Sequence, residues 1–409
     1  MEQERIDLRC CIAGGGPAGM MLGLLLARLG IEVLVLEKHA DFLRDFRGDT
    51  IHPSTLQVMY ELGLLEDFLK LPHDQVETLY GQVGSTTLQV ADFSHLPTHS
   101  KFMVLMPQWD FLDFLAGAAK RYPGFRLRLQ AEATELIEAG GRIAGLRAKT
   151  PEGTLEVHAD LVVAADGRHS LLRAKAGLEV IDLGAPIDAL WLRLSRRAGD
   201  PGQTAGRFDA GRILVMLNRG SYWQCAFVIR KGGFEAIRAA GLPAFREILA
   251  SLAPYLADRL EELASWEDVK LLTVQVNRLR QWHRSGFLCI GDAAHAMSPI
   301  GGVGINLAIQ DAVATANLLG EVLKRGAPSE RELQAVQRRR TFPTVMTQGL
   351  QVLVQNRVIG RVLGSAAITR LPWLLRLVRR YPSLTRLGAR VIGVGFRPEH
   401  VSKVTSKGP

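Results

Sequence analysis

Apolar runs and glycine-rich turns alternate along the first forty residues of the chain. Residues 7–13 form an apolar run typical of a buried strand, and a helical apolar run follows it and ends at Gly30. A second apolar run, residues 31–36, predicts another buried strand. A strand, a helix and a strand in this order predict a βαβ unit.

The turn inside this unit has the pattern GxGxxG. Gly14 permits the tight turn, Gly16 lets the backbone approach a pyrophosphate, and Gly19 lets the helix pack closely on the sheet. The N-terminus of the helix directs free N–H groups at the phosphates. Glu37, at the end of the second strand, can accept hydrogen bonds from ribose hydroxyls. The unit predicts a dinucleotide site without choosing between NAD and FAD, with contacts from Gly14, Gly16, Pro17, Ala18, Gly19, Glu37 and Lys38.

Two later motifs each follow a short apolar run. Residues 159–165 predict a buried strand that leads into Asp166-Gly167, and residues 286–290 predict one that leads into the sequence GDAAH at 291–295. Pro299 and a glycine-rich run over residues 301–306 come next and open an apolar helix that continues to Leu319. A helix N-terminus with several glycine N–H groups can stabilise the negative charge of a reduced flavin.

These three motifs, in this order, resemble those of the group A flavoprotein monooxygenases, the FAD-dependent aromatic hydroxylases that include para-hydroxybenzoate hydroxylase and the ubiquinone-biosynthesis hydroxylases. The resemblance covers about residues 5–345 and the ending at 395–400. It implies an α/β fold, in which a Rossmann-like FAD-binding domain carries an inserted β-sheet substrate domain and a C-terminal helical segment. It also implies FAD as the cofactor and NADPH or NADH as co-substrate.

The resemblance assigns roles to single residues. Asp292 would bind the ribityl chain of FAD, and Asp166 would lie near the pyrophosphate and take part in NAD(P)H binding. Arg47 matches an arginine that contacts the FAD phosphate and lines the path of the nicotinamide, and Gln108 matches a flavin-contacting position. The residues alone also allow a helix cap at Asp292, a solvated arginine at 47 and an ordinary helix start at Gln108.

The loop at 299–306 supplies the remaining expected flavin contacts. The family often has glutamine where Val303 stands, which removes a side-chain contact but leaves the backbone donors. His52 is a candidate to face the flavin, with a capping role as the alternative, and His295 is expected to brace its loop. The catalytic centre is expected to contain Arg47, His52 and Pro299, and the loop contacts are Gly291, Pro299, Gly302, Val303, Gly304, Ile305 and Asn306.

The middle of the chain has the pattern of a sheet. Residues 185–194, 212–217, 222–229 and 270–276 have β character, with a hairpin turn at 218–220 and an interrupting helix at 242–256. The expected FAD-binding domain comprises residues 1–76, 94–180 and 281–345, the substrate domain 77–93 and 181–280, and the C-terminal segment 346–409. Aromatic and amide side chains are candidates to face the substrate, with sheet packing as the alternative: Trp191, Phe208, Tyr222, Trp223 and Gln224.

Composition excludes several classes of protein. With 47% hydrophobic and 22% charged residues the chain is globular rather than disordered. None of the four cysteines forms a CxxC pair, so buried structural thiols are expected, and without a disulfide framework or a signal peptide the expected location is cytoplasmic. The sequence shows no metal-ligand spacing, no Ser-His-Asp pattern, no membrane-spanning run and no nucleic-acid-binding module.

The positive charge lies at the end of the chain. From Arg357 onward there are eleven Lys and Arg and one acidic residue, so this part has a formal charge of +10. Because the net charge of the whole chain is +9, residues 1–356 together carry −1. Residues 368–380 form a short basic amphipathic segment with Trp373, which could contact an anionic membrane surface or pack as a C-terminal helix. Deletion after about residue 365 is expected to leave activity on soluble substrates. The protein is expected to be a monomer or homodimer.

The resemblance implies hydroxylation of an aromatic or lipophilic small molecule by NAD(P)H and O2, through a flavin C4a-hydroperoxide. The alternatives are a reductase or halogenase on the same scaffold, or a flavoprotein scaffold in a biosynthetic complex. The chain lacks the WxWxIP motif of flavin halogenases, and reductases of this scaffold usually lack the histidine of GDAAH. Intact Asp292 and Arg47 argue against a purely structural role.

Overall fold

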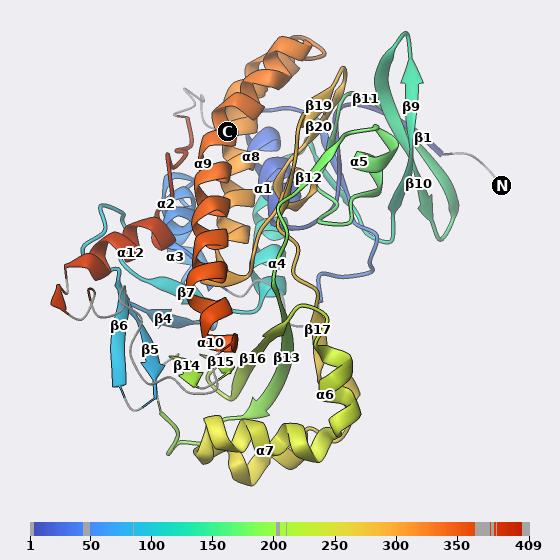
Figure 1. Ribbon diagram of the computed structural model, residues 1–409. Coiled ribbons are helices and arrows are strands. Elements are labelled where there is room, and N and C mark those ends of the chain that lie inside the picture. Colours follow the sequence, from blue (N-terminus) through green and yellow to red (C-terminus); the bar gives the residue numbers. More distant parts are fainter. Residues whose placement is uncertain are drawn as a thin grey trace.

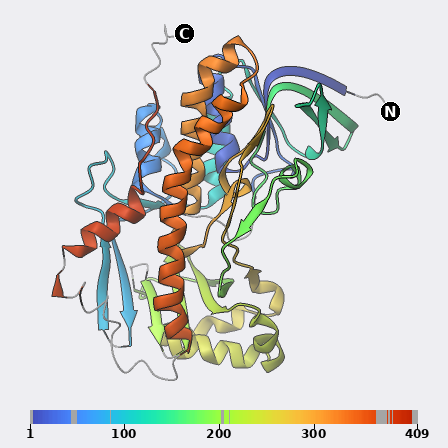
Figure 2. The same cartoon turned by 45° about the horizontal axis from the view of Figure 1, so that its top comes forward.

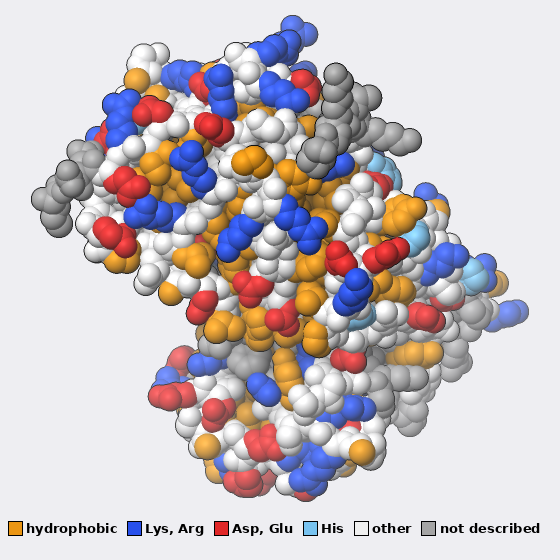
Figure 3. Space-filling model, turned by 180° about the vertical axis from the view of Figure 1, so that it is seen from behind, with side chains coloured by type: hydrophobic (Ala, Val, Ile, Leu, Met, Phe, Trp, Pro, Cys, Tyr) orange, Lys and Arg blue, Asp and Glu red, His pale blue; other side chains and the backbone are white. Residues whose placement is uncertain are grey.

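The computed structural model describes residues 4–43, 50–84, 86–201, 205–209, 211–364, 377, 380–381 and 383–402. Arg47 therefore lies outside the described residues, as does most of the segment 368–380. The described chain has two lobes, with the N-terminal sheet in one and a second large sheet in the other (Figure 1). From behind, hydrophobic side chains gather on the surface between the lobes, which is hollowed at one side (Figure 3).

The first lobe is built on a sheet whose middle strands are parallel and buried. Its order is β19-β20-β11-β1-β2-β8, and β10 and β9 extend β11 as an antiparallel ribbon. The last four residues of β1 and all of β2 are buried, as expected for apolar strands covered on both faces. The strands are β1 Glu4–Ala13, β2 Val33–Leu36, β8 Phe125–Arg128, β9 Glu132–Ala139, β10 Arg142–Thr150, β11 Gly153–Ala164, β19 His283–Arg284 and β20 Phe287–Cys289.

Helices cover this sheet. α1 Pro17–Arg28 packs against α4 Gln108–Ala119 and α8 Gly304–Arg325, and α9 Glu330–Val354 packs on α8. The smaller helices are α2 Pro53–Glu61, α3 Leu65–Phe68 and α5 Leu171–Lys175. The four free cysteines are buried, and burial raises the pKa of the Cys225 thiol to about 12, which confirms the structural interpretation.

The second lobe is a seven-stranded sheet. Its order is β17-β13-β16-β15-β14-β5-β6, so the hairpin near residue 80 joins strands from the middle of the chain as expected. α6 Phe234–Ala240 and α7 Leu242–Leu252 cover its outer face (Figure 1). The strands are β5 Thr78–Val83, β6 Thr86–Asp92, β13 Ile187–Ser195, β14 Ala205–Asp209, β15 Arg212–Asn218, β16 Tyr222–Arg230 and β17 Lys270–Leu272.

Several elements differ from the expected bounds. The helix expected over 242–256 ends at Leu252, because Pro254 lacks an N–H and starts a separate 3-10 helix, Pro254–Glu262. The strand expected over 270–276 ends at Leu272, and β14 is not predicted. The bounds of the domains stay a prediction.

Two small sheets link the lobes. One consists of β3 Thr50–Ile51, β7 Met103–Leu105 and β4 Asp74–Val76, and the other of β12 Val180–Asp182, β18 Asn277–Leu279 and β21 His295–Ala296. A short 3-10 helix, Trp266–Asp268, precedes β17.

The C-terminal part of the chain lies along both lobes. α9 runs past the expected boundary at residue 345, becomes a π-helix at Gln355–Ile359 and continues as α10 Gly360–Gly364 (Figure 2). α12 Leu384–Gly393 packs on β6. None of the helices in the described ranges is long and apolar enough to cross a membrane.

Candidate cofactor and active site

The sheet brings the three motifs to one edge. Ala13 pairs with Ala164 and Leu36, and Ala164 pairs with Cys289, so four parallel strands end side by side. The glycine turn, Glu37, Asp166 and the GD motif each follow one of these strands. The carboxyl ends of parallel strands are where open α/β sheets bind ligands.

The glycine turn has the geometry of a phosphate cradle. Gly14 has a φ of 110°, and a Cβ there would lie 2.3 Å from the carbonyl oxygen of Ala165. A Cβ at Gly19 would lie 2.0 Å from the oxygen of Gly14, whereas a Cβ at Gly16 would meet nothing within 4 Å. No side chain caps the N-terminus of α1, and its first turn carries no acidic residue. The turn is therefore closed toward the protein and open where a diphosphate would lie.

Glu37 lies beside this turn. It is buried, and its Oε2 accepts a hydrogen bond from the N–H of Gly15 at 3.0 Å while its Oε1 accepts one from His39 at 3.1 Å. A carboxylate oxygen can accept more than one hydrogen bond, and this side chain lies at the edge where ribose hydroxyls would bind. Lys38, the next residue, is exposed at the same edge.

The DG and GD motifs contact each other directly. Arg168 pairs with Asp292 at 3.5 Å, and Arg173 donates to the carbonyl oxygens of Ala293 and Arg168. Asp292 does not cap the 3-10 helix Gly291–Ala293, which removes the capping alternative. Asp166 is partly buried, and the loss of solvent around its carboxyl group raises the pKa of that group. Its Oδ1 has no hydrogen-bond partner among the described residues.

Hydrogen bonds from Thr50 and Asn306 fix the loop at 299–306. Pro299 precedes the 3-10 helix Ile300–Gly302, whose glycines 301 and 302 have φ values of 77° and 62°. No side chain caps α8, which begins at Gly304 after Val303, and its first turn carries no acidic residue. Asn306 donates to the oxygen of Gly302, and Thr50 donates to the same oxygen at 3.2 Å. The expected loop contacts thus lie together at a second uncapped helix N-terminus.

His52 is fixed against this loop. Its backbone N–H donates to the Oδ1 of Asn306 at 3.1 Å, and its Nδ1 lies 2.7 Å from the carbonyl oxygen of Ile392 in α12. Because a carbonyl only accepts, Nδ1 carries the proton and Nε2 is left as an acceptor. Nε2 is buried without a partner among the described residues, 3.5 Å from where a Cβ at Gly302 would lie. His52 is also the residue before α2, but its side chain makes no capping hydrogen bond to that helix.

The buried state of His52 makes stability depend on pH. Burial lowers the pKa of His52 from 6.5 to about 4, so the unfolded chain binds more protons between these values. The His52 contribution is therefore fully present above pH 6.5 and is lost as the pH falls toward 4. Between pH 6.5 and 5 we expect the wild type to lose about 2 kcal/mol more than His52→Gln does, by urea unfolding. Parallel stability curves for the two proteins would contradict the buried neutral histidine.

A buried charge network supports the GD motif from behind. Asp311 of α8 accepts hydrogen bonds from the N–H of Gly291 and from Nε of Arg340, and it lies 2.6 Å from Nε2 of His295. Burial alone would raise the pKa of Asp311, but His295 and Arg340 outweigh it and hold the pKa below its ordinary value. Arg340 also reaches Glu399 at 3.5 Å. The contact of His295 with Asp311 confirms the expected bracing role.

Three glutamines, two on α9 and one at the start of the π-helix that follows it, hold the segment before the loop. Gln351 accepts a hydrogen bond from the N–H of Ser298 and donates one to its carbonyl oxygen, and Gln355 donates to the Ser298 hydroxyl. Gln348 donates to the oxygens of Asn277 and Ala296. All three side chains are buried. Their spacing places them on one helix face, and this is the signal in the sequence from which they could have been found. They were not among the expected site residues.

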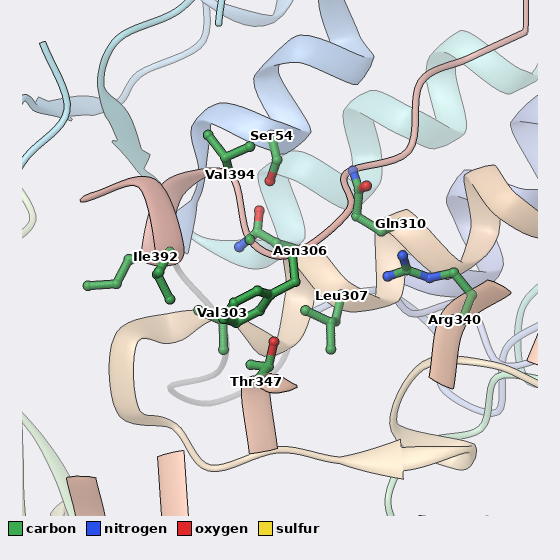
Figure 4. A pocket seen from close by; sticks show the side chains of 12 residues that line it. Ser54, Val303, Asn306, Leu307, Gln310, Arg340, Thr347, Ile392 and Val394 are labelled. Atoms are coloured by element: carbon green, nitrogen blue, oxygen red, sulfur yellow. The ribbon is translucent and has the colours of Figure 1, made fainter. Parts of the chain in front are cut away.

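A narrow cleft lies between the start of α8, the middle of α9 at Arg340 and Thr347, and residues 391–396 (Figure 4). Val303 and Asn306 border the cleft on the side of α8, Thr347 borders it on the side of α9, and Ile392 borders it on the side of α12. The cleft therefore reaches the flavin loop from the side of the C-terminal segment.

The candidates for substrate contact divide between the two faces of the second sheet. The prediction that Trp223 faces the substrate is wrong, because Trp223 is fully buried toward α7 and its Nε1 donates to Asp200.

The opposite face of the sheet carries the other candidates. Trp191 pairs with Ala226 on this face, and its buried Nε1 has no partner among the described residues. On this face, Tyr222 lies under the guanidinium of Arg193 at 4.0 Å, and Phe208 packs with Ile213 and Val215. Gln224 accepts a hydrogen bond from Arg219. Gln108 begins α4, which packs on α1.

Comparison with known proteins agrees with this geometry. Residues 7–349 match the family described as FAD binding domain. The chain belongs to the group A FAD-dependent aromatic hydroxylase family. It is 33% identical over 389 residues to 6-methylpretetramide 4-monooxygenase of Streptomyces rimosus, covering 93% of this chain and 91% of that one. It is 24% identical to para-nitrophenol 4-monooxygenase of a Pseudomonas strain over 339 residues, covering 81% and 82% of the two chains.

Solved structures show the same fold. The OxyS anhydrotetracycline hydroxylase from Streptomyces rimosus matches with a TM-score of 0.74 and 22% identity, covering 95% of this chain and 76% of that chain. The Rossmann-like fold with its second sheet is therefore confirmed, and the family and the relatives identify the protein as an FAD-dependent monooxygenase. FAD at the sheet edge fits the uncapped helix N-termini and the open side of Gly16. It also fits the Asp166 Oδ1, which has no partner within the described part of the chain.

The pair between Asp292 and Arg168 leads to a prediction. Asp292→Ala is expected to raise the Kd for FAD about tenfold or more, because it removes both a carboxylate acceptor and the partner that orders the DG loop. Fluorescence titration of the apoprotein with FAD measures this change. Asp209→Ala, on β14 of the second sheet, is the matched control. Stoichiometric FAD at wild-type affinity in Asp292→Ala would refute the role given to this carboxylate.

Proposed function

We propose that this enzyme hydroxylates a small aromatic or lipophilic molecule, with NADPH or NADH as reductant and O2 as the oxygen donor. The observation that carries the proposal is the meeting of the GxGxxG turn, the DG and GD motifs and the uncapped α8 N-terminus within one lobe. The identity of 33% with a named aromatic monooxygenase over nearly the whole chain supports it.

Bound FAD would supply the redox chemistry, taking a hydride from NAD(P)H and activating O2 at its C4a position. The protein itself would hold the reactants in place and shield them from water. The N-terminus of α1 would bind the diphosphate, and Glu37 the adenosine ribose. The backbone donors at the start of α8 would stabilise the negative charge of the reduced ring system without a competing side chain.

The β13 to β16 face of the second sheet would cover the substrate and exclude water. Residues there offer an indole N–H from Trp191 and a cation–aromatic pair from Arg193 and Tyr222. These groups suit a flat ring system that carries oxygen acceptors. The compound in the name of the relative from Streptomyces rimosus, 6-methylpretetramide, is therefore the first substrate to test, followed by para-nitrophenol.

The experiment is a comparison of NADPH and NADH oxidation with and without each aromatic compound. We expect one compound to raise the rate of NAD(P)H oxidation and to yield a hydroxylated product by mass spectrometry. If NAD(P)H were oxidised with every compound but only hydrogen peroxide and no hydroxylated product formed, the proposed substrate class would be wrong. The Trp191→Phe variant should raise KM more than it lowers kcat if the indole N–H binds the substrate.

The proposal includes peripheral contact with a membrane by the basic C-terminal part, which would suit a lipophilic substrate. The basic charge of residues 357–409 supports it, at about 1 kcal/mol for each cation near an anionic surface. The stretch first considered for this contact, 368–380, lies mostly outside the described residues.

A further inference from the structure

The second half of α9 has its polar and apolar faces reversed. The side chains that it directs into the protein include Arg340, Thr344, Gln348 and Gln351, all of which are buried, and the buried Gln355 continues this row into the π-helix. Its outward face over the same turns is apolar: Phe342, Val345, Met346, Leu350 and Leu353. A helix on the surface of a soluble protein normally shows the opposite arrangement.

These five side chains form a continuous stripe, here called the α9 stripe. They are between 37% and 52% exposed. Apart from the neighbours Val345 and Met346, successive members lie three or four residues apart, which places them on one face over about 16 Å of helix. Contiguous exposed apolar surface of this kind marks a place where something else binds. α9 lies on the outside of the molecule in both ribbon views (Figures 1 and 2).

The part of the sequence that contains the stripe carries charge of one sign. The sequence from residue 333 to residue 398 contains twelve arginines and no lysine, aspartate or glutamate. Arg338 and Arg357 are exposed about one turn before and one turn after the stripe, and Arg397 lies over the ring of Phe342 at 4.2 Å. Further exposed arginines are Arg380, Arg386 and Arg390. The α9 stripe is thus an apolar surface bordered by cations.

We propose that the α9 stripe inserts into the interface of an anionic lipid membrane, with the surrounding arginines at the headgroups. The inference rests on the membrane contact proposed above and assigns it to described residues of α9. A second copy of the chain fits less well, because two such faces would bring two sets of arginines together without an acidic partner. Nucleic acid would use the arginines but would leave the apolar side chains without a function.

The experiment uses the full chain reconstituted with FAD and two kinds of vesicle. One kind is phosphatidylcholine alone, and the other is equal parts of phosphatidylcholine and phosphatidylglycerol. The test variant is Met346→Asp with Leu350→Asp, which places charge in the middle of the stripe. The control is Leu318→Asp, a leucine of α8 that is 39% exposed, as Leu350 is. FAD content and circular dichroism establish that each variant is folded.

We expect the wild type and the control to sediment with the anionic vesicles and not with phosphatidylcholine alone. The double variant should bind at least about tenfold more weakly, because both the apolar contact and the local positive potential are reduced. Equal binding by the double variant, or no binding by the wild type, would overturn the proposal. A wild-type dimer that the double variant converts to a monomer would assign the stripe to a second copy instead. Loss of binding to duplex DNA in the double variant, without vesicle binding by the wild type, would assign it to nucleic acid.

The same samples separate this inference from the proposed function. NAD(P)H oxidation is measured without vesicles, so failure to hydroxylate any compound leaves vesicle binding unaffected. Absence of vesicle binding likewise leaves hydroxylation of a soluble substrate intact.

Discussion

Replacing Asp311 by alanine is expected to lower the free energy of unfolding by about 3–5 kcal/mol and to weaken retention of FAD. Asp311 is completely buried and is the common acceptor for Arg340, His295 and the N–H of Gly291. Among the described residues, its removal leaves the Arg340 guanidinium with Glu399 as its acidic partner, at 3.5 Å, and it also releases the first residue of the GD motif. Urea unfolding and the FAD content of the purified protein measure the two effects.

A double variant separates loss of charge from loss of volume. Asp311→Leu combined with Arg340→Met should cost less than the sum of the two single changes, because neither buried charge then lacks its partner. Asp67→Ala, which breaks an exposed pair with Lys70, should change little. Additive single effects at 311 and 340 would show that the network is not coupled.

Gly14→Ala is expected to lower the affinity for FAD at least about a hundredfold, through strain and displacement of the turn. The residue has a φ of 110°, and a Cβ would lie 2.3 Å from the oxygen of Ala165 at the end of the neighbouring strand. The backbone must move at the point where the diphosphate would bind. FAD titration followed by fluorescence measures the change.

Gly30 provides a matched control for this prediction. It also has a positive φ, 79°, but a Cβ there would meet nothing within 4 Å. Gly30→Ala should lose about 1–2 kcal/mol of stability from strain and keep the wild-type affinity for FAD. If both variants bound FAD equally well, the close approach at Gly14 would have no part in binding.

The βαβ unit and the three motifs could be predicted because each depends on residues close together in the sequence. The expected turn at Gly14 and the strands at 7–13 and 159–165 are all confirmed. The charge network could not be predicted in this way, because it joins Asp311, Arg340 and Glu399 from separate elements. The hydrogen-bond partners of a buried carboxylate follow from the packing of α8 on α9, which local periodicity does not specify.

The contacts of the C-terminal part likewise could not be predicted from local sequence patterns. The sequence suggests that residues after about 365 can be removed without loss of activity, but the structure argues against this. Glu399 pairs with Arg339 and Arg340, and the carbonyl oxygen of Ile392 fixes His52 beside the flavin loop. Deletion after 365 would remove all of these contacts, so we expect it to weaken FAD binding as well as any contact with lipid.

Incorporation of labelled oxygen tests the central claim most directly. The purified chain, with bound FAD and NADPH or NADH, is supplied with 18O2 and the aromatic compound that most raises NAD(P)H oxidation. The account predicts that the product gains a single oxygen atom, that this atom is 18O, and that one NAD(P)H is consumed for each product formed. An oxygen atom derived from water, or a product formed without O2, would contradict a monooxygenase.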